Sequence, residues 1–194
     1  MEDSRIEDMI EALTAFSAVL KAQRGQPSLH LDVLMDAHLH TRKKLARVVS
    51  LIAQSDLTRA LDSVDSAIEN IAQFLRNSLS GQVDPKHIKI RGYRGVHGML
   101  LEYLLRHEGR NVSGEALRAL VGDQIHTERR IRELRDLGFE LATIKENGVD
   151  FYRLAHKRQD LDYASKFILR KTLKSHRTDF SDREIAHVEA YLAS

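Results

Sequence analysis

The sequence contains no cysteine, no tryptophan and only two prolines among its 194 residues. A chain without thiols has no disulfide, no thiolate zinc site and no cysteine nucleophile, which fits the cytoplasmic location that we expect. Proline interrupts helices, so its scarcity favours long ones. No apolar run approaches the roughly 18 residues that a transmembrane helix needs, and no signal peptide is expected from the acidic start Met1-Glu2-Asp3.

Charge is distributed unevenly along the chain, although the formal net charge is only +2. Residues 1–80 contain 9 Lys and Arg against 11 Asp and Glu, whereas residues 86–158 contain 15 against 10. The basic excess therefore lies on the middle of the chain, which is where a polyanion would bind.

The first 80 residues predict three helices in which mostly apolar side chains recur at alternating spacings of three and four. These positions are Ile6, Met9, Leu13, Phe16 and Leu20, then Leu31, Leu34, His38, Thr41, Leu45, Val48 and Ile52, and finally Leu57, Leu61, Val64, Ile68, Ile71 and Leu75. Such seams indicate helices that pack at shallow angles. We expect a helical bundle that forms a homodimer through the third seam. The alternative is a bundle that packs internally, against the middle of the chain.

The middle of the chain predicts a fixed order of short elements. A helix that ends at Gly109 is followed by a short extended piece, Asn111-Val112, and by a second helix that Ser113 caps. A third helix, expected to be capped by Asp123 and to end at Gly138, precedes two alternating stretches over 139–144 and 150–154. Asn147-Gly148 between these stretches is a strong hairpin signal, because both positions favour positive φ.

This order, namely helix, strand, helix, turn, helix and hairpin, is that of the winged-helix fold. The amino-acid sequence itself also resembles a known family. The stretch LLRHEGRNVSGEAL at 104–117, the helix RIRELR at 130–135 and the closing strand that ends in Tyr152-Arg153-Leu154 are similar to the winged helix-turn-helix domains of two-component response regulators. A related pattern accompanies some restriction and mobile-element nucleases. The resemblance covers about residues 94–154 and implies binding to double-stranded DNA.

The third helix of this segment is the expected recognition helix. If Ile131 and Leu134 face the core, arginines occupy its opposite face, and a recognition helix places such side chains in the major groove. We expect base contacts from Gln124, His126, Thr127, Arg129 and Arg130. Contacts to the DNA backbone are expected from Arg91, Arg94, Arg132, Arg135, Lys145 and Arg153. The same arginines could instead pair with acidic residues of their own helix.

Enzymatic functions find little support in the sequence. Asp36 and His40 are spaced for one helix face, but no second histidine pair accompanies them, so no metal site is expected. Arg170 and His176 loosely match the spacing of a helical ribonuclease motif, with Lys171 where that family has a different polar residue. There is no phosphate-binding glycine loop and no nucleophile elbow. We expect a non-enzyme with no catalytic residue and no cofactor.

The sequence thus predicts a mainly α protein with four parts. Residues 1–80 form the bundle, 81–93 a basic linker, 94–158 the winged helix-turn-helix domain with a small β-hairpin wing, and 159–194 the C-terminal helices. The last of these helices is expected to start at Ser181, with Glu184 as its capping partner. The expected function is sequence-specific DNA binding as a homodimeric transcriptional regulator without membrane association. The alternative is a DNA-targeting or adaptor subunit of a defence or mobile-element system, which would recruit an effector protein.

Overall fold

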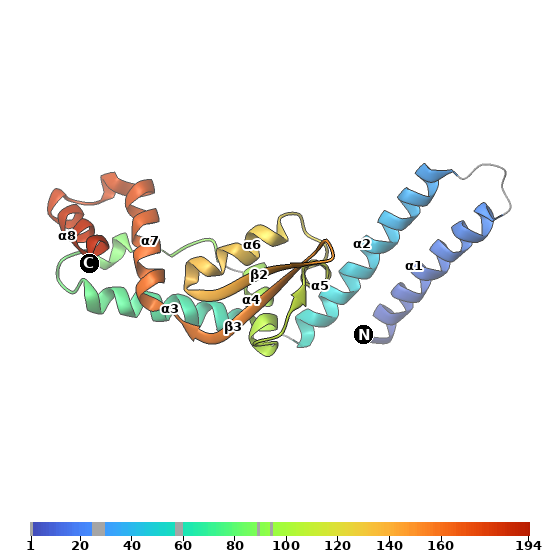
Figure 1. Ribbon diagram of the computed structural model, residues 1–194, viewed down its shortest axis with the longest axis horizontal. Helices are drawn as coiled ribbons and strands as arrows, with labels where there is room; N and C mark the ends of the chain where they lie inside the picture. Colours follow the sequence, from blue (N-terminus) through green and yellow to red (C-terminus); the bar gives the residue numbers. More distant parts are fainter. Residues whose placement is uncertain (1, 25–29, 57–59, 89, 94) are drawn as a thin grey trace. The chain divides into compact units, whose positions relative to one another are not determined.

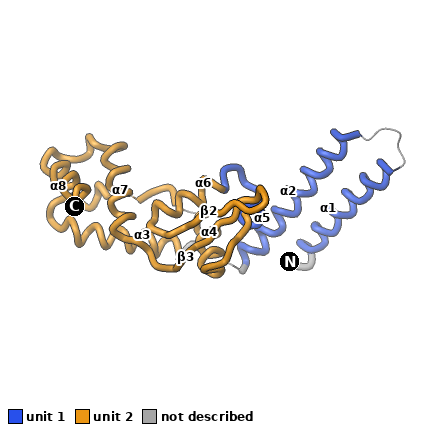
Figure 2. Tube along the Cα trace, viewed as in Figure 1, with its two compact units in different colours: residues 1–58, 114–127 blue, residues 59–113, 128–194 orange. Residues whose placement is uncertain are grey.

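The computed structural model describes residues 2–24, 30–56, 60–88, 90–93 and 95–194. The chain forms two compact units that interleave along the sequence, as Figure 2 shows: residues 1–58 with 114–127 form unit 1, and residues 59–113 with 128–194 form unit 2. The predicted parts do not match these units, because the third predicted helix belongs to unit 2.

The predicted fold class, mainly α with a small hairpin sheet, is confirmed (Figure 1). The helices of unit 1 are α1 (Glu2–Gln23), α2 (Leu31–Asp56) and α5 (Gly114–Leu120). Those of unit 2 are α3 (Ala60–Ser78), α4 (Val96–Arg106), α7 (Leu161–His176) and α8 (Asp182–Ala193), with the short helices η1 (Pro85–His87), η2 (Arg135–Leu137) and η3 (Arg177–Asp179). α6 (Thr127–Glu133) begins at the last residue of unit 1 and continues in unit 2. Within the described ranges, no helix is long and apolar enough to cross a membrane.

In unit 1, α1 and α2 pack against each other as an antiparallel helical hairpin, and α2 also packs against α5. The turn after α5 is fixed to α2 by an ion pair of 2.7 Å between Arg42 Nη2 and Asp123 Oδ1. The α1 seam predicted from the sequence divides between two faces. Met9 and Phe16 are half-buried, whereas Leu13 is 51% exposed.

In unit 2, α3 packs against α4 and α7. Val64, Ile71 and Leu75 of α3 are almost completely buried within one copy of the chain, and Ile68 is half-buried. Leu57 and the side chain of Leu61 lie outside the described residues. The seam predicted to form a dimer therefore contributes to the core of unit 2, which favours the internal alternative, and dimerisation through it stays a prediction.

The sheet of unit 2 is antiparallel, with strands in the order β1 (Val112–Ser113), β3 (Val149–Gln159) and β2 (Phe139–Glu146). The predicted turn is confirmed, since Asn147 and Gly148 have φ angles of 50° and 81°. Both strands are longer than the sequence pattern predicts. β3 continues to Gln159, whose side-chain amide donates to the carbonyl of Ala67 in α3 and to that of Leu137 in η2.

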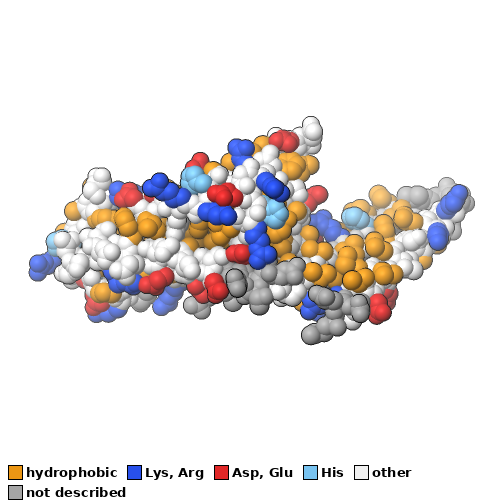
Figure 3. Space-filling model, turned by 90° about the horizontal axis from the view of Figure 1, so that it is seen from below, with side chains coloured by type: hydrophobic (Ala, Val, Ile, Leu, Met, Phe, Trp, Pro, Cys, Tyr) orange, Lys and Arg blue, Asp and Glu red, His pale blue; other side chains and the backbone are white. Residues whose placement is uncertain are grey.

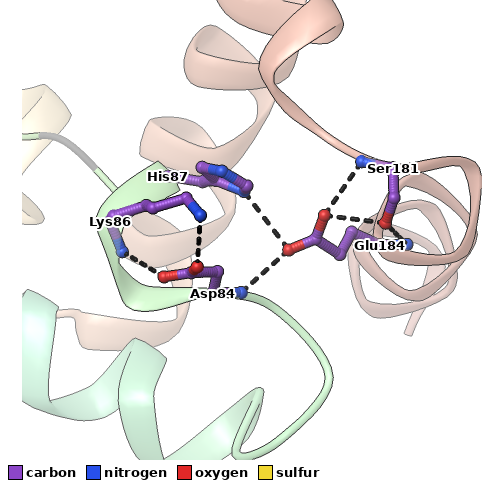
Figure 4. Close-up of polar contacts among 5 residues, drawn as sticks. All are labelled: Asp84, Lys86, His87, Ser181 and Glu184. Carbon is purple, nitrogen blue, oxygen red and sulfur yellow. Dashed lines mark hydrogen bonds and ion pairs between the residues drawn. The ribbon is translucent and has the colours of Figure 1, made fainter.

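The segment after α3, predicted to be a linker, is attached to α8. Figure 4 shows Glu184 accepting a hydrogen bond from the backbone N–H of Asp84 at 2.9 Å and pairing with His87 Nδ1 at 3.2 Å. The other oxygen of Glu184 accepts from the N–H and hydroxyl of Ser181, which completes the predicted capping box at the start of α8. Val83 and Tyr93 are buried, so parts of this segment belong to the core.

Candidate nucleic-acid interface

α6, the expected recognition helix, is short and begins later than the sequence suggests. It spans Thr127–Glu133, and the preceding turn contains positive φ angles at Gly122, Asp123 and His126. Asp123, predicted to cap the helix, instead has a φ of 56° and pairs with Arg42. The helix is prolonged by η2 and then ends at Gly138 in the left-handed conformation, as predicted.

The inner and outer faces of α6 are largely those predicted. Ile131 and Leu134 have no exposed surface, whereas the side chains of Arg129 and Arg130 are 69% and 44% exposed. Thr127 differs from the prediction, because it is only 1% exposed and its hydroxyl donates to the carbonyl of Gln124 at 2.8 Å. Thr127 therefore stabilises the turn and is not available to a base edge.

Three further predicted contact residues near this helix are exposed. Gln124 and His126 lie in the turn before it, and Arg132 lies on the helix itself. The exposed side chains of α6 are thus mainly guanidinium groups, which bind guanine edges and phosphates through paired N–H donors.

Glu133, at the last residue of α6, binds both predicted base-reading arginines. Its Oε1 accepts from Arg129 Nε at 2.9 Å, and its Oε2 accepts from Arg130 Nη1 at 3.1 Å. The same Oε2 lies 2.8 Å from Nε2 of His97, a side chain of α4 that is 1% exposed. Arg129 and Arg130 are therefore held in one orientation by a carboxylate that α4 fixes in place.

The hydrogen-bond partners of Glu133 keep its carboxyl group ionised. Partial burial on its own raises the pKa of Glu133, but hydrogen bonds from His97, Arg129 and Arg130 outweigh it and lower that pKa to about 2. The carboxylate neutralises part of the charge of the two arginines at neutral pH. The two guanidinium groups are therefore oriented, but their charge is only partly available to another anion.

A second group of polar side chains, next to His97, lies where η2 follows α6. Tyr93 Oη donates to Asp136 Oδ2 at 3.4 Å, the Tyr93 ring lies 5.5 Å from that of His97, and Lys171 Nζ of α7 lies 5.5 Å from the Tyr93 ring centre. Burial raises the pKa of Tyr93, and the neighbouring Asp136 raises it further. Burial likewise raises the pKa of Asp136, against the opposing charge of Lys171.

The remaining candidates for backbone contacts differ in accessibility. Arg91 is exposed beside this second group and lines a small cavity with Tyr93 and Lys171, while Arg94 lies outside the described residues. Arg135 is half-buried, and its Nη2 donates to Thr143 Oγ1 of β2 at 2.7 Å. Arg135 is therefore partly committed to the sheet.

The hairpin register separates the two predicted backbone contacts of the wing. Residues that pair directly across an antiparallel ladder share a face of the sheet. Lys145 pairs with Asp150, and Thr143 pairs with the buried Tyr152. The two pairs are two residues apart along each strand, so they lie on the same face. Arg153 pairs with Ala142 and lies on the opposite face. Only Lys145 shares the face that carries Thr143, the acceptor of Arg135.

The structure thus brings Arg129 and Arg130 together through Glu133, and it places Arg135 and Lys145 on one side of the hairpin. It does not bring Arg153 to that side. Sequence reasoning missed His97, Tyr93 and Asp136 as supports of α6. Only the spacing of three and four residues from the arginines to Glu133 gave a signal, and it did not identify His97 as the further partner.

The comparison with protein families gives one match. The family described as the KpnI N-terminal domain matches residues 98–165, a little over a third of the chain. This range runs from α4 into α7 and includes α6 and the whole of β2 and β3. The match links this part of the chain to restriction-system proteins and is compatible with DNA binding. No curated protein and no solved structure is detectably similar to the chain.

Proposed function

We propose that the protein binds double-stranded DNA in a sequence-specific manner, with α6 in the major groove and the β2–β3 hairpin beside it. The observation that carries the proposal is the exposed pair Arg129 and Arg130, oriented by the half-buried acceptor Glu133. Arginines held in this way are suited to bidentate contacts with guanine. The basic excess of residues 86–158 and the match to a restriction-system domain support the same conclusion.

The proposal is tested by selecting bound sequences from a pool of random duplexes and measuring affinity for the selected site. Arg130→Ala should cost about 1–3 kcal/mol on that site and relax discrimination at one base pair. Arg170→Ala, which removes an exposed arginine of α7, is the matched control and should have little effect. A pool without enrichment, or equal losses from both variants, would reject the proposed placement of α6.

A second proposal concerns the biological role that DNA binding would serve. The family match favours a DNA-targeting component of a restriction system, whose other parts would act on the bound site. The alternative is a dimeric transcriptional regulator. Stable co-purification with a nuclease or ATPase encoded nearby would support the first role, and specific binding to the protein's own upstream region would support the second.

We further infer that the chain has no catalytic activity of its own. The sequence carries neither a paired-carboxylate nuclease motif nor a phosphate-binding glycine loop. Purified protein incubated with Mg²⁺ and plasmid DNA should leave the DNA intact. Cleavage that persists through purification to homogeneity would contradict this inference.

A further inference from the structure

The α1–α2 hairpin presents an apolar surface that nothing in unit 1 covers. α1 has two parallel rows of side chains, an inner seam and an outer seam. The inner seam contacts α2 and has the buried Ala12 at its centre. The outer seam is shifted by one residue and is exposed: Ile6, Ile10, Leu13 and Leu20 are 51%, 57%, 51% and 47% exposed. With Ser17 they recur at spacings of four and three, which is the pattern of a helix that contacts a second helix.

The outer seam continues into a groove between α1 and α2. This groove measures about 480 Å³. Its apolar lining includes Leu13 and Phe16 of α1 and Leu45 and Val49 of α2, and α5 and the Arg42–Asp123 ion pair border it. Leu31 and Met35, 65% and 52% exposed, precede these α2 residues along the same side of the helix at heptad-like spacing. Figure 3 shows hydrophobic side chains gathered over this hairpin. Two helices alone cannot bury such a face, whereas four can.

The charges of α1 indicate what covers the face. Glu7, Asp8 and Glu11 lie in its N-terminal half, and Lys21 and Arg24 lie at its C-terminal end, all exposed. Glu7 and Lys21 are two heptads apart, so they occupy the same edge of the outer seam. Two antiparallel copies of α1 bring the acidic half of one helix beside the basic end of the other, whereas parallel copies would place like charges together.

We propose that the outer seam of α1 binds a second copy of this chain, so that two α1–α2 hairpins form an antiparallel four-helix bundle around a two-fold axis near Leu13. The surface is self-complementary in both apolar pattern and charge, as a two-fold interface requires. It also differs from the α3 seam, whose residues Val64, Ile71 and Leu75 are already buried within one copy. The proposal does not depend on DNA binding and is tested in its absence.

The first experiment measures mass in solution by light scattering and sedimentation across micromolar concentrations. Wild-type protein should be a dimer. Ile10→Glu with Leu13→Glu should raise the dissociation constant roughly 100-fold or more while leaving helical circular dichroism unchanged, because both side chains are exposed in one copy. Val33→Glu is the control, since Val33 is 43% exposed on another side of α2. A monomeric wild type, or a dimer that survives the double substitution, would overturn the proposal.

The second experiment tests the antiparallel arrangement and uses the absence of native cysteine. Leu13→Cys should form a disulfide-linked dimer under mild oxidation, whereas Val33→Cys should not. Glu7→Lys should weaken the dimer roughly tenfold, and adding Lys21→Glu should restore it. A dimer that fails to cross-link through residue 13 and gains nothing from the paired reversal would exclude this pairing of α1.

Discussion

His97 Nε2 of α4 lies 2.8 Å from Glu133 Oε2 at the end of α6, and the histidine side chain is almost completely buried. The other contacts of Glu133 are Arg129 and Arg130. One buried residue therefore fixes a carboxylate that in turn orients two exposed arginines. In the proposed function, this arrangement reduces the conformational freedom that the arginines lose on reaching a base pair.

The first prediction concerns that carboxylate. Glu133→Gln keeps the shape of the side chain and one oxygen acceptor but removes its charge. The surface of α6 then gains net positive charge, and the hydrogen bonds that orient the two arginines are weakened. Affinity for random duplexes should rise and the ratio of specific to random affinity should fall, by about tenfold for a loss of 1.4 kcal/mol. Fluorescence anisotropy with both duplexes measures this ratio. Glu128→Gln makes the same charge change on α6, and an equal fall in that variant would show that net charge alone matters.

The second prediction uses the two faces of the hairpin. Lys145→Ala should weaken binding to specific and random duplexes about equally and reduce the slope of log affinity against log salt by about 0.9 for each phosphate that is no longer neutralised. Arg153→Ala removes the same charge from the opposite face and should change the slope much less. Salt titrations of the two variants beside wild type provide the measurement. A larger effect of Arg153→Ala would mean that the other face of the wing meets DNA.

The third prediction concerns the glycine that ends η2. Gly138 has a φ of 85°, and a Cβ added there would lie 2.3 Å from the carbonyl oxygen of Asp160. Gly138→Ala should destabilise the protein by about 3 kcal/mol, through the left-handed conformation and the collision together. Gly148→Ala has a similar φ of 81° but meets nothing within 4 Å, so it should cost only about 1–2 kcal/mol. Urea denaturation compares them, and equal losses would contradict the role of the Asp160 contact.

The fourth prediction is a pH dependence of stability at α8. Hydrogen bonds from the backbone of Asp84 and from Ser181 lower the pKa of Glu184 to about 2, from an ordinary value of 4.5. A lowered carboxyl pKa stabilises the fold fully above the ordinary value, and this stabilisation is lost as the pH falls from 4.5 towards 2. Glu184→Gln should therefore be less stable than wild type at pH 7, and the difference should shrink over that range.

Thermal unfolding at several pH values measures the fourth prediction, with Glu189→Gln as the control. Glu189 lies on the same helix and pairs with Arg177 at the surface, where an ion pair contributes little. A deficit of Glu184→Gln that stays constant from pH 7 to pH 2.5 would show that the carboxylate charge is not what fastens Asp84 to α8.

The features that the sequence predicted correctly depend on local signals. The turn at Asn147-Gly148, the capping box of Ser181 and Glu184 and the core positions Ile131 and Leu134 each follow from spacing within a few residues. The errors involve contacts between distant segments. The burial of Thr127 and the support of Glu133 by His97 depend on tertiary packing, which periodicity does not encode.

The interpretation of the α3 seam depends on the same kind of long-range contact. The same alternating seam suits a partner in another chain or in another part of the same chain. Its residues Val64, Ile71 and Leu75 are buried in unit 2. On α1, the exposed seam keeps Ile6, Leu13 and Leu20 of the predicted one, but the half-buried Met9 and Phe16 each lie one residue from its other members, Ile10 and Ser17. A shift of one residue rotates a helix face by about 100°, and only burial distinguishes the two faces.

The interleaving of the two units determines how the protein can be divided. α5 lies between β1 and α6 in the sequence, yet it belongs to unit 1 and packs against α2. A fragment that begins at residue 59 would keep α5 but lose α2, and Asp123 would lose Arg42. No single cut yields both units intact. A recombination event that replaced residues 1–58 alone would therefore also exchange the helix on which α5 packs, so the new hairpin would have to fit the old α5.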